Sequence, residues 1–308
     1  MPVFENRIGL NVTRKKLQLI EICYDREGFI LENISEAYFD DGLDLLHDKE
    51  TKVNAILQSA FNEILIEKSI KSNFVSLSLP VELFFIHHIP YDNTLLSYDL
   101  IEEFRWEFSI LHPYEKFDEY SFQYYEMDKS PTFPYHSAIV AAINRSVIKK
   151  VLSFVQSNNL KLKFIDNAHF SFDKALQYSD PLFAEGLLMS LFYSSSLLSI
   201  ELLSGGKTVF YNSFKVDNAG GIVNFITDFI SKSEVFKAAD TGKTRAYIYG
   251  EEISDTILDS LNNQLPVEFA RLNPFSNIYI NPELKENKCL TSKPFSFAPA
   301  AGISFRLI

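Results

Sequence analysis

The sequence predicts a mixed α/β protein built of two lobes that share one plan. Each half of the chain opens with a β-hairpin and a third strand, and then continues through helices and further strands. Apolar residues alternate in the strand segments and recur at helical spacing in the others. A repeat of one supersecondary unit indicates two similar lobes. The expected division is a first lobe at residues 1–180 and a second lobe at residues 181–308.

The first half contains the larger set of elements. Residues 7–21 have the pattern of a strand, a tight polar turn and a second strand, and residues 28–39 that of a third antiparallel strand. Strands are then expected at residues 74–80, 83–90, 119–127, 137–143 and 160–165. Helices are expected at residues 49–68, 99–112, 146–157 and 171–177. Residues 130–134 contain two prolines, which predict a loop.

The second half repeats the opening of the first. Its expected elements are paired strands at 187–193 and 196–203, a third strand at 208–214, a helix at 222–229, a strand at 245–250 and a helix at 254–261. Gly205 and Gly206 mark a hairpin turn between the second and third strands. With Lys207 and Thr208 they resemble the end of a phosphate-binding loop, but the first glycine of that motif is missing. The hairpin is therefore the preferred interpretation.

Composition excludes several classes of function. A chain of 308 residues with 46% hydrophobic and 22% charged residues is typical of a folded protein of about two domains. The net charge of −11 disfavours binding to nucleic acid or to anionic lipid. The two cysteines, Cys23 and Cys289, fit no metal or redox motif and are expected to be reduced thiols. The longest uncharged apolar stretch, residues 186–200, is shorter than the ~20 residues that span a membrane. A soluble cytosolic protein is expected, attached to a membrane only if a partner holds it there.

Short motifs, in the same order along the chain, resemble the type IV pilus assembly protein PilM and its actin-like relatives, which include FtsA and the cytoplasmic part of GspL. The matching segments are 8–10, 17–21, 103–107, 112–114, 164–166, 273–275 and 298–304. The resemblance implies two ribonuclease-H-like lobes, the actin-like ATPase arrangement, that face one cleft. It also implies a small inserted α+β subdomain at about residues 73–127 of the first lobe.

In this superfamily each lobe offers a hairpin whose turn amides hold phosphates, after an aspartate that positions Mg²⁺. At the first-lobe positions stand Asn11, in place of the aspartate, and Thr13, in place of the glycine. Asn11 brings no charge to a metal. Arg14, Lys15 and Lys16 make the turn cationic. The turn either holds a phosphate electrostatically or is a solvated hairpin tip.

The second-lobe positions are altered as well. Phe192 stands at the aspartate and Ser194 at the glycine, and the loop that faces adenosine in the family carries a single glycine, Gly250, before Glu251 and Glu252. Phenylalanine cannot coordinate Mg²⁺, and the two acids would repel a polyphosphate. Serines near Ser194 can hydrogen-bond a phosphate or simply form a turn. Phosphoryl transfer depends on positioning and electrostatics, so the sequence predicts no hydrolysis.

The resulting hypothesis is a non-catalytic actin-like scaffold or adaptor, a pseudo-ATPase without cofactor or metal. PilM-type relatives bind a cytoplasmic peptide of an inner-membrane protein, which implies a similar partner in a pilus- or secretion-like envelope assembly. The aromatic strand at residues 120–125 is a candidate surface for it, or else part of the core. The alternative is an ATP-binding switch that retains nucleotide without turnover. A third possibility, a sugar kinase of the same superfamily, needs a catalytic aspartate, for which Asp166 is the candidate.

Histidines give no metal site in this interpretation. His87 and His88 are neighbours in an expected strand, so their rings point to opposite faces. His112 and His136 have no partners at the spacing of metal ligands.

Overall fold

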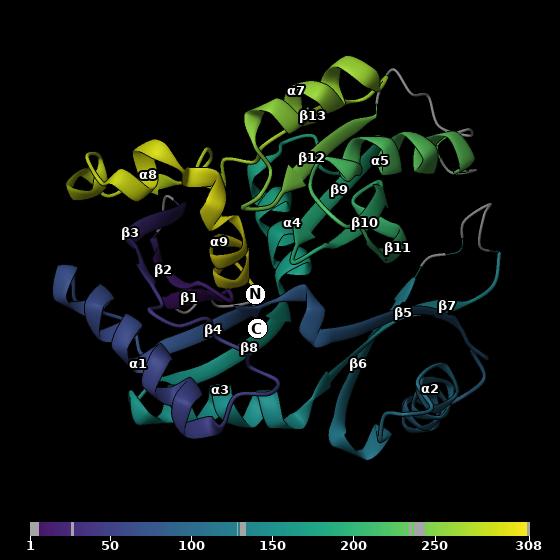
Figure 1. Cartoon of the computed structure of the whole chain (residues 1–308), viewed down its shortest axis with the longest axis horizontal. Helices are drawn as coiled ribbons and strands as arrows, with labels where there is room; N and C mark the ends of the chain where they lie inside the picture. Colours follow the sequence, from purple (N-terminus) through teal and green to yellow (C-terminus); the bar gives the residue numbers. More distant parts are fainter. Residues whose placement is uncertain are drawn as a thin grey trace. The chain divides into compact units, whose positions relative to one another are not determined.

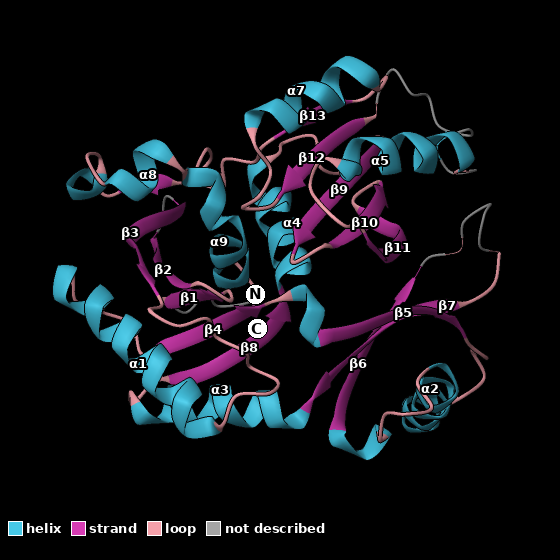
Figure 2. Ribbon diagram, in the orientation of Figure 1, coloured by secondary structure: helices cyan, strands magenta, loops and turns pink. Residues whose placement is uncertain are grey.

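The computed structural model describes residues 6–25, 28–127, 129, 134–233, 236 and 244–306. The chain divides into two compact units. Unit 1 comprises Met1–Val81, Ser146–Pro181 and Leu272–Ile308, and unit 2 comprises Glu82–Arg145 and Leu182–Arg271. Figure 1 traces the chain by residue number and Figure 2 by secondary structure.

Unit 1 is built on a six-stranded sheet in the order β14-β3-β2-β1-β4-β8. Its strands are β1 (Arg7–Val12), β2 (Lys16–Asp25), β3 (Gly28–Tyr38), β4 (Phe74–Leu79), β8 (Lys161–Asn167) and β14 (Tyr279–Ile280). Strands β1, β2 and β3 are antiparallel, whereas β4 runs parallel to β1 and β8 parallel to β4. All six residues of β1 are buried, because the sheet is covered on both faces.

Five helices of unit 1 surround this sheet. They are α1 (Glu50–Glu67), α3 (Arg145–Ser157), α4 (Ala168–Ser179), α8 (Lys288–Ser292) and α9 (Ala298–Ser304). Helices α1 and α3 lie together on one face, where Phe61 and Phe154 meet edge to face, and α4 and α9 lie on the other (Figure 2). Helix α9 is apolar and every one of its residues is buried.

Two glycines allow α9 to lie directly on its neighbours. A Cβ added to Gly9 of β1 would stand 2.1 Å from the carbonyl oxygen of Ala300, and a Cβ added to Gly302 would stand 1.6 Å from that of Ser171 in α4. Glycine is needed where backbones approach this closely. Gly9 therefore allows α9 to lie on β1, and Gly302 allows the same helix to lie on α4.

Unit 2 contains a five-stranded sheet in the order β11-β10-β9-β12-β13. Its strands are β9 (Leu187–Ser194), β10 (Leu197–Ser204), β11 (Lys207–Lys215), β12 (Arg245–Tyr249) and β13 (Glu268–Ala270). Helices α5 (Gly221–Lys232) and α7 (Asp255–Gln264) pack on one face over a core that includes Leu191 and Ile226. Counted along the chain, the sheet of unit 2 has the order 3-2-1-4-5, and the sheet of unit 1 has the same order with β14 added beside its third strand, so the predicted two-lobe fold is confirmed.

A smaller three-stranded sheet, in the order β5-β7-β6, completes unit 2. Its antiparallel strands are β5 (Phe84–Pro90), β6 (Tyr120–Met127) and β7 (Ser137–Asn144), and helix α2 (Ser97–Leu111) covers one face (Figure 2). The buried side of α2 is formed by Leu100, Phe104 and Phe108, spaced by four residues. Strands β5 and β6 also lie against β11.

The predicted helices and strands agree with those observed to within a few residues, but two expected boundaries differ from the structure. The expected insertion at 73–127 begins one strand too early, because β4 pairs with β1 in the large sheet, and it leaves out β7, the central strand of the small one. The expected second lobe at 181–308 includes residues 272–308, which the structure places in unit 1. There β14 extends the sheet at the edge of β3 and α9 covers β1. The expected loop at 130–134 lies outside the described residues except for Pro134.

Within the described part of the chain, no helix is both long and apolar enough to cross a membrane.

Candidate functional site

The turn between β1 and β2 is closed by its own threonine. The backbone amides of Lys15 and Lys16 both donate to Oγ1 of Thr13 at 3.1 Å, and the Thr13 hydroxyl donates to the carbonyl oxygen of Lys16 at 3.2 Å. The amide of Thr13 donates to that same carbonyl at 3.0 Å. Two of the amides that a phosphate would need are thus already bound inside the turn, which is the typical arrangement of a threonine turn.

Asn11 begins a buried chain of polar contacts. Its side chain is 2% exposed, and its Nδ2 donates to Oε1 of Gln18 at 2.9 Å. Gln18 in turn donates through Nε2 to Oε2 of Glu36 at 3.1 Å. The Lys16 ammonium donates to the same Glu36 oxygen at 3.1 Å, and Lys293 pairs with the other oxygen of Glu36. Asn11 therefore supports the packing of β1, β2 and β3.

The Glu36 carboxylate holds this polar chain together. Burial raises the pKa of Glu36, but hydrogen bonds and charge from Lys293 and Lys16 outweigh burial, and the pKa lies below its ordinary value. The side chains of Lys16 and Glu36 are only 4% and 5% exposed. Of the cationic turn predicted at residues 14–16, Lys16 is thus a buried ion-pair partner, whereas Arg14 and Lys15 are exposed.

In unit 2, Phe192 fills the second aspartate position with an aromatic contact. It is 3% exposed and stacks on Tyr249 of the adjacent parallel strand, with ring centroids 4.6 Å apart and an interplanar angle of 24°. Residues Leu191 and Tyr193 on either side point into the core beneath α5 and α7, so Phe192 lies on the opposite face of the sheet. The phenyl ring of Phe192 offers no oxygen ligand for a metal at this position.

The serines and the glycine of unit 2 have structural roles. Ser194 pairs with Leu197, and Ser195 and Ser196 between them have positive φ values of 51° and 64°, so these residues form a two-residue hairpin turn. A Cβ added to Gly250 would stand 2.7 Å from the carbonyl oxygen of Tyr193. Gly250 is thus explained by the close packing of its backbone on β9.

The six sequence-predicted positions fall into two groups. Asn11, Thr13 and Lys15 share one hairpin of unit 1, and Phe192, Ser194 and Gly250 lie on adjacent segments of unit 2. None of the six residues offers a carboxylate, and two turn amides of the first group have partners within the turn. Mg²⁺ prefers oxygen ligands, and phosphates bind where amides are free to donate. The residues at these positions do not fit a magnesium nucleotide.

Comparison with solved structures places the fold. A chain of the PilM–PilN type IV pilus biogenesis complex aligns with a TM-score of 0.70 and 16% identity, covering 97% of each chain. A Bacteroides thetaiotaomicron protein of unknown function, described as having an actin-like ATPase fold, aligns with a TM-score of 0.50 and 13% identity, covering 86% of this chain and 90% of that one. The chain has an actin-like ATPase fold. No protein-family model and no curated protein matches the sequence. The predicted resemblance to PilM is confirmed at the level of the fold.

Asp166, the aspartate that a sugar kinase of this fold would need for catalysis, is engaged in an ion pair. Asp166 of β8 is mostly buried, with 15% of its side chain exposed, and forms an ion pair with Arg306 near the end of the described chain. Burial raises the pKa of Asp166, and the charge of Arg306 lowers it less than burial raises it. This pairing ties the closing segment to the actin-like sheet.

A histidine contact in the small sheet was missed by the sequence analysis. Nε2 of His87 in β5 lies 2.7 Å from Nε2 of His112, which follows α2. Burial lowers the pKa of His87 to about 4, with a further contribution from His112, and burial also lowers the pKa of His112. The sequence analysis considered partners of His112 only at the spacing of metal ligands, which does not include His87. His88 points to the other side, to the hydroxyl of Ser137, as predicted from strand alternation.

One face of the aromatic strand β6 is packed in the hydrophobic core. Tyr120, Phe122 and Tyr124 pack beneath α2, and Tyr120 is 5% exposed. Tyr125 points the other way and donates to Thr208 of β11 at 3.4 Å. Of the two interpretations of residues 120–125, the core one describes three of the four aromatic side chains.

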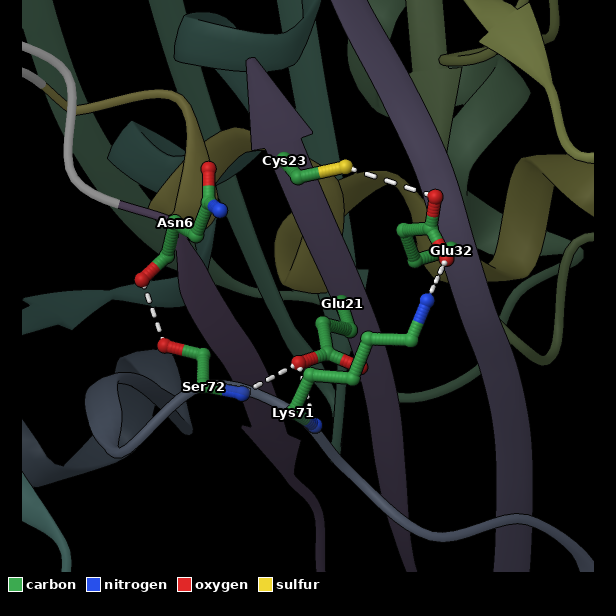
Figure 3. Close-up of a pocket in the computed structure, with 6 residues that line it drawn as sticks. All are labelled: Asn6, Glu21, Cys23, Glu32, Lys71 and Ser72. Carbon is green, nitrogen blue, oxygen red and sulfur yellow. Dashed lines mark hydrogen bonds and ion pairs between the residues drawn. The ribbon is translucent and has the colours of Figure 1, made fainter. Parts of the chain in front are cut away.

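In a small pocket of unit 1, the polar groups of the lining residues bond to one another (Figure 3). Its volume is about 250 Å³, and it is lined by Asn6, Glu21, Cys23, Glu32, Lys71 and Ser72. The Lys71 ammonium lies 2.7 Å from Glu32, and the Cys23 thiol faces the same carboxylate at 3.5 Å. Glu21 accepts from the amides of Lys71 and Ser72 at 2.8 and 2.6 Å. Burial and the neighbouring Glu32 raise the pKa of Cys23 to about 11, which makes its thiol a poor nucleophile.

Proposed function

We propose that this chain is a non-catalytic, actin-like adaptor that acts by binding another protein. The observation that carries the proposal is the threonine turn, in which the amides of Lys15 and Lys16 donate to Thr13. The buried contact of Asn11 with Gln18 and the stacking of Phe192 on Tyr249 support it, because both aspartate positions of the ATPase pattern are used for packing. Without carboxylates to position Mg²⁺, phosphoryl transfer loses its main catalytic term.

The partner in this proposal is a cytoplasmic segment of an inner-membrane protein, within a pilus- or secretion-like envelope assembly. The structural similarity to a chain of the PilM–PilN complex supports a protein partner. In this proposal the adaptor is a cytoplasmic protein that lies at the inner membrane because its partner does.

The test of the adaptor proposal is an ATP hydrolysis assay on the purified full chain. Phosphate release with Mg-ATP is expected to equal the background of buffer alone. The informative variant is Lys15→Ala, because Lys15 is exposed and its removal leaves the turn intact, and Lys129→Ala is the matched exposed control. Turnover that Lys15→Ala abolishes and Lys129→Ala preserves would refute the proposal.

The exposed pair Arg14 and Lys15 favours one alternative, an ATP-binding switch without turnover. Ligand at a hundredfold excess over its dissociation constant stabilises a protein by about 2.7 kcal/mol. The adaptor proposal expects no thermal shift at millimolar Mg-ATP, whereas the switch expects a clear increase in Tm that is lost in Lys15→Ala.

A further inference from the structure

Helix α2 of the small sheet has a second apolar face. Tyr98, Trp106 and Ile110 are 74%, 61% and 53% exposed. With Glu102 these residues are spaced by four, so they form one ridge along the helix. Tyr114, 99% exposed, follows shortly after the helix ends.

This ridge contributes nothing to the packing of α2. The helix is held on its sheet by Leu100, Phe104 and Phe108, which are at most 4% exposed. Single exposed apolar residues are common, whereas several large ones on one face of a helix are typical of an interaction site. Tryptophan and tyrosine are also the side chains most often found at the centre of protein interfaces.

Acidic side chains flank the ridge. The helix carries four acids, Asp99, Glu102, Glu103 and Glu107, and a single basic residue, Arg105. Arg105 is committed to Glu102, with its Nη1 2.7 Å from Oε1. Glu103 and Glu107 are left beside Trp106 and Ile110 without that compensation.

Glu103 shows the effect of this uncompensated charge. Burial raises its pKa, and the charges of Asp92 and Glu107 raise it further. Its Oε2 atom is buried and has no hydrogen-bond partner among the described residues. A guanidinium or ammonium group placed beside the half-buried Glu103 carboxylate would relieve this repulsion.

We propose that the outer face of α2 binds a cationic amphipathic segment of a partner protein, and this inference rests on the adaptor function proposed above. The apolar side chains of the segment lie over Trp106 and Ile110, and its lysine or arginine groups lie at Glu103 and Glu107. Such a segment matches the cytoplasmic flank of an inner-membrane protein, where lysine and arginine are enriched.

The charges favour this occupant over two others. A two-fold dimer through α2 would bring the acidic outer faces of two identical helices together, with Glu103 and Glu107 of both copies in one interface. An anionic bilayer would be repelled by these acids and by the net charge of −11. A basic peptide is attracted by both.

The single tryptophan of the chain, Trp106, makes a direct measurement possible. The probe is a synthetic amphipathic peptide of leucine and lysine that lacks tryptophan, added to the full-length protein. Binding at α2 transfers the indole from water to an apolar contact, so a blue shift of its emission is expected. A peptide with glutamate in place of lysine is expected to give no shift.

Affinity is then compared among variants by anisotropy of the dye-labelled lysine peptide. Trp106→Ala is expected to weaken binding about tenfold or more, as for a central interface residue. Replacing Glu103 and Glu107 together by Gln is expected to weaken binding and to flatten its dependence on salt. Ile66→Ala and Glu63→Gln on α1, where Ile66 is 86% exposed, are matched controls expected to bind as the wild type does.

Three outcomes would overturn the inference. Equal peptide binding by the α2 variants and the α1 controls would show that binding depends on the overall charge of the protein and not on the outer face of α2. A blue shift with phosphatidylglycerol vesicles but not with the peptide would identify a membrane surface. A dimer in light scattering that Trp106→Ala dissociates would identify a second copy as the occupant. The hydrolysis assay on the same samples tests the adaptor function separately, since turnover refutes that function whatever the peptide does.

Discussion

Restoring the first aspartate of the ATPase pattern, by Asn11→Asp, is expected to weaken the fold without creating a magnesium site. The exchange is nearly isosteric, so it leaves no cavity. It removes the Nδ2 donor and sets two acceptor oxygens against Oε1 of Gln18, in a place where Asn11 is 2% exposed. The Nε2 of Gln18 is already committed to Glu36 and Ser296.

The magnitude follows from these contacts. Leaving the buried oxygen of Gln18 without its donor costs about 1–3 kcal/mol. Burial of the new carboxylate adds to this, so the expected loss in the free energy of unfolding at pH 7 is about 2–4 kcal/mol. Burial raises the pKa of the new carboxyl above its unfolded value near ~3.9. Below that unfolded value the carboxyl is neutral in both states, so the charge penalty appears only as the pH rises through the folded pKa.

Urea denaturation of both proteins at pH 7 and pH 4 measures this difference. The loss is expected to be smaller at pH 4, because the new carboxyl is then largely protonated. Asn93→Asp, at an exposed position, is the matched control and is expected to lie within about 0.5 kcal/mol of the wild type. A variant Asn11→Asp that is as stable as the wild type at pH 7 and gains Mg²⁺-dependent ATP binding would refute the reasoning.

Three further predictions concern the elements around the site. Gly302→Ala is expected to lower the free energy of unfolding by at least about 1–3 kcal/mol, because its Cβ would stand 1.6 Å from a carbonyl oxygen of α4. Gly42→Ala, where the nearest atom is 3.8 Å away, is the control. Urea denaturation measures the stability of both variants. Glu36→Gln leaves the buried ammonium of Lys16 without its carboxylate and is expected to cost about 3–5 kcal/mol. The pKa of Glu36 is lowered on folding, so the contribution of this carboxylate to the stability of the wild type is full above the unfolded value of 4.5. It is lost as the pH falls through the folded pKa. The pH dependence of unfolding should show this loss in the wild type and not in Glu36→Gln. With a pKa near 11, Cys23 is expected to react with a thiol reagent at pH 8 far more slowly in the folded protein than in urea, which mass spectrometry of the labelled peptide measures.

The regular elements could be predicted because their apolar residues follow the strand and helix periods over long runs. Helix α2 was expected at residues 99–112 and spans Ser97–Leu111, and β7 was expected at residues 137–143 and spans Ser137–Asn144. The return of the closing segment to unit 1 could not be predicted in this way. Strand β14 has two residues, and the position of α9 depends on a backbone approach at Gly9 and Gly302 rather than on a periodic pattern.

At the candidate site the residue types could be predicted from the sequence, but the contacts of these residues could not. It could show that Phe192 cannot bind a metal, but not that its ring stacks on Tyr249, since that contact depends on the register of β9 and β12. The threonine turn had a local signal, because a threonine hydroxyl in a turn can accept backbone amides a few residues along the chain, here those of Lys15 and Lys16. The approach of His87 to His112 had none, since the two residues are 25 positions apart and meet only when α2 closes on its sheet.

The replaced positions bear on function because each replacement has been integrated into the fold. A position at which the aspartate or glycine had only been replaced would leave the polar groups of the turn without partners. A single reverse substitution could then restore the nucleotide site. Here Thr13 occupies amides of its own turn, Asn11 is joined through Gln18 to a buried ion pair, and Phe192 stacks in the sheet. A nucleotide would have to compete with Thr13 for the amides of Lys15 and Lys16, at a cost of about 1 kcal/mol for each hydrogen bond broken. By contrast, the outer face of α2 has its large side chains in solvent and gives up no internal contact when a partner covers it. In our proposal the outer face of α2 is therefore the surface that binds a protein, and its residues are not among the nucleotide positions of the fold.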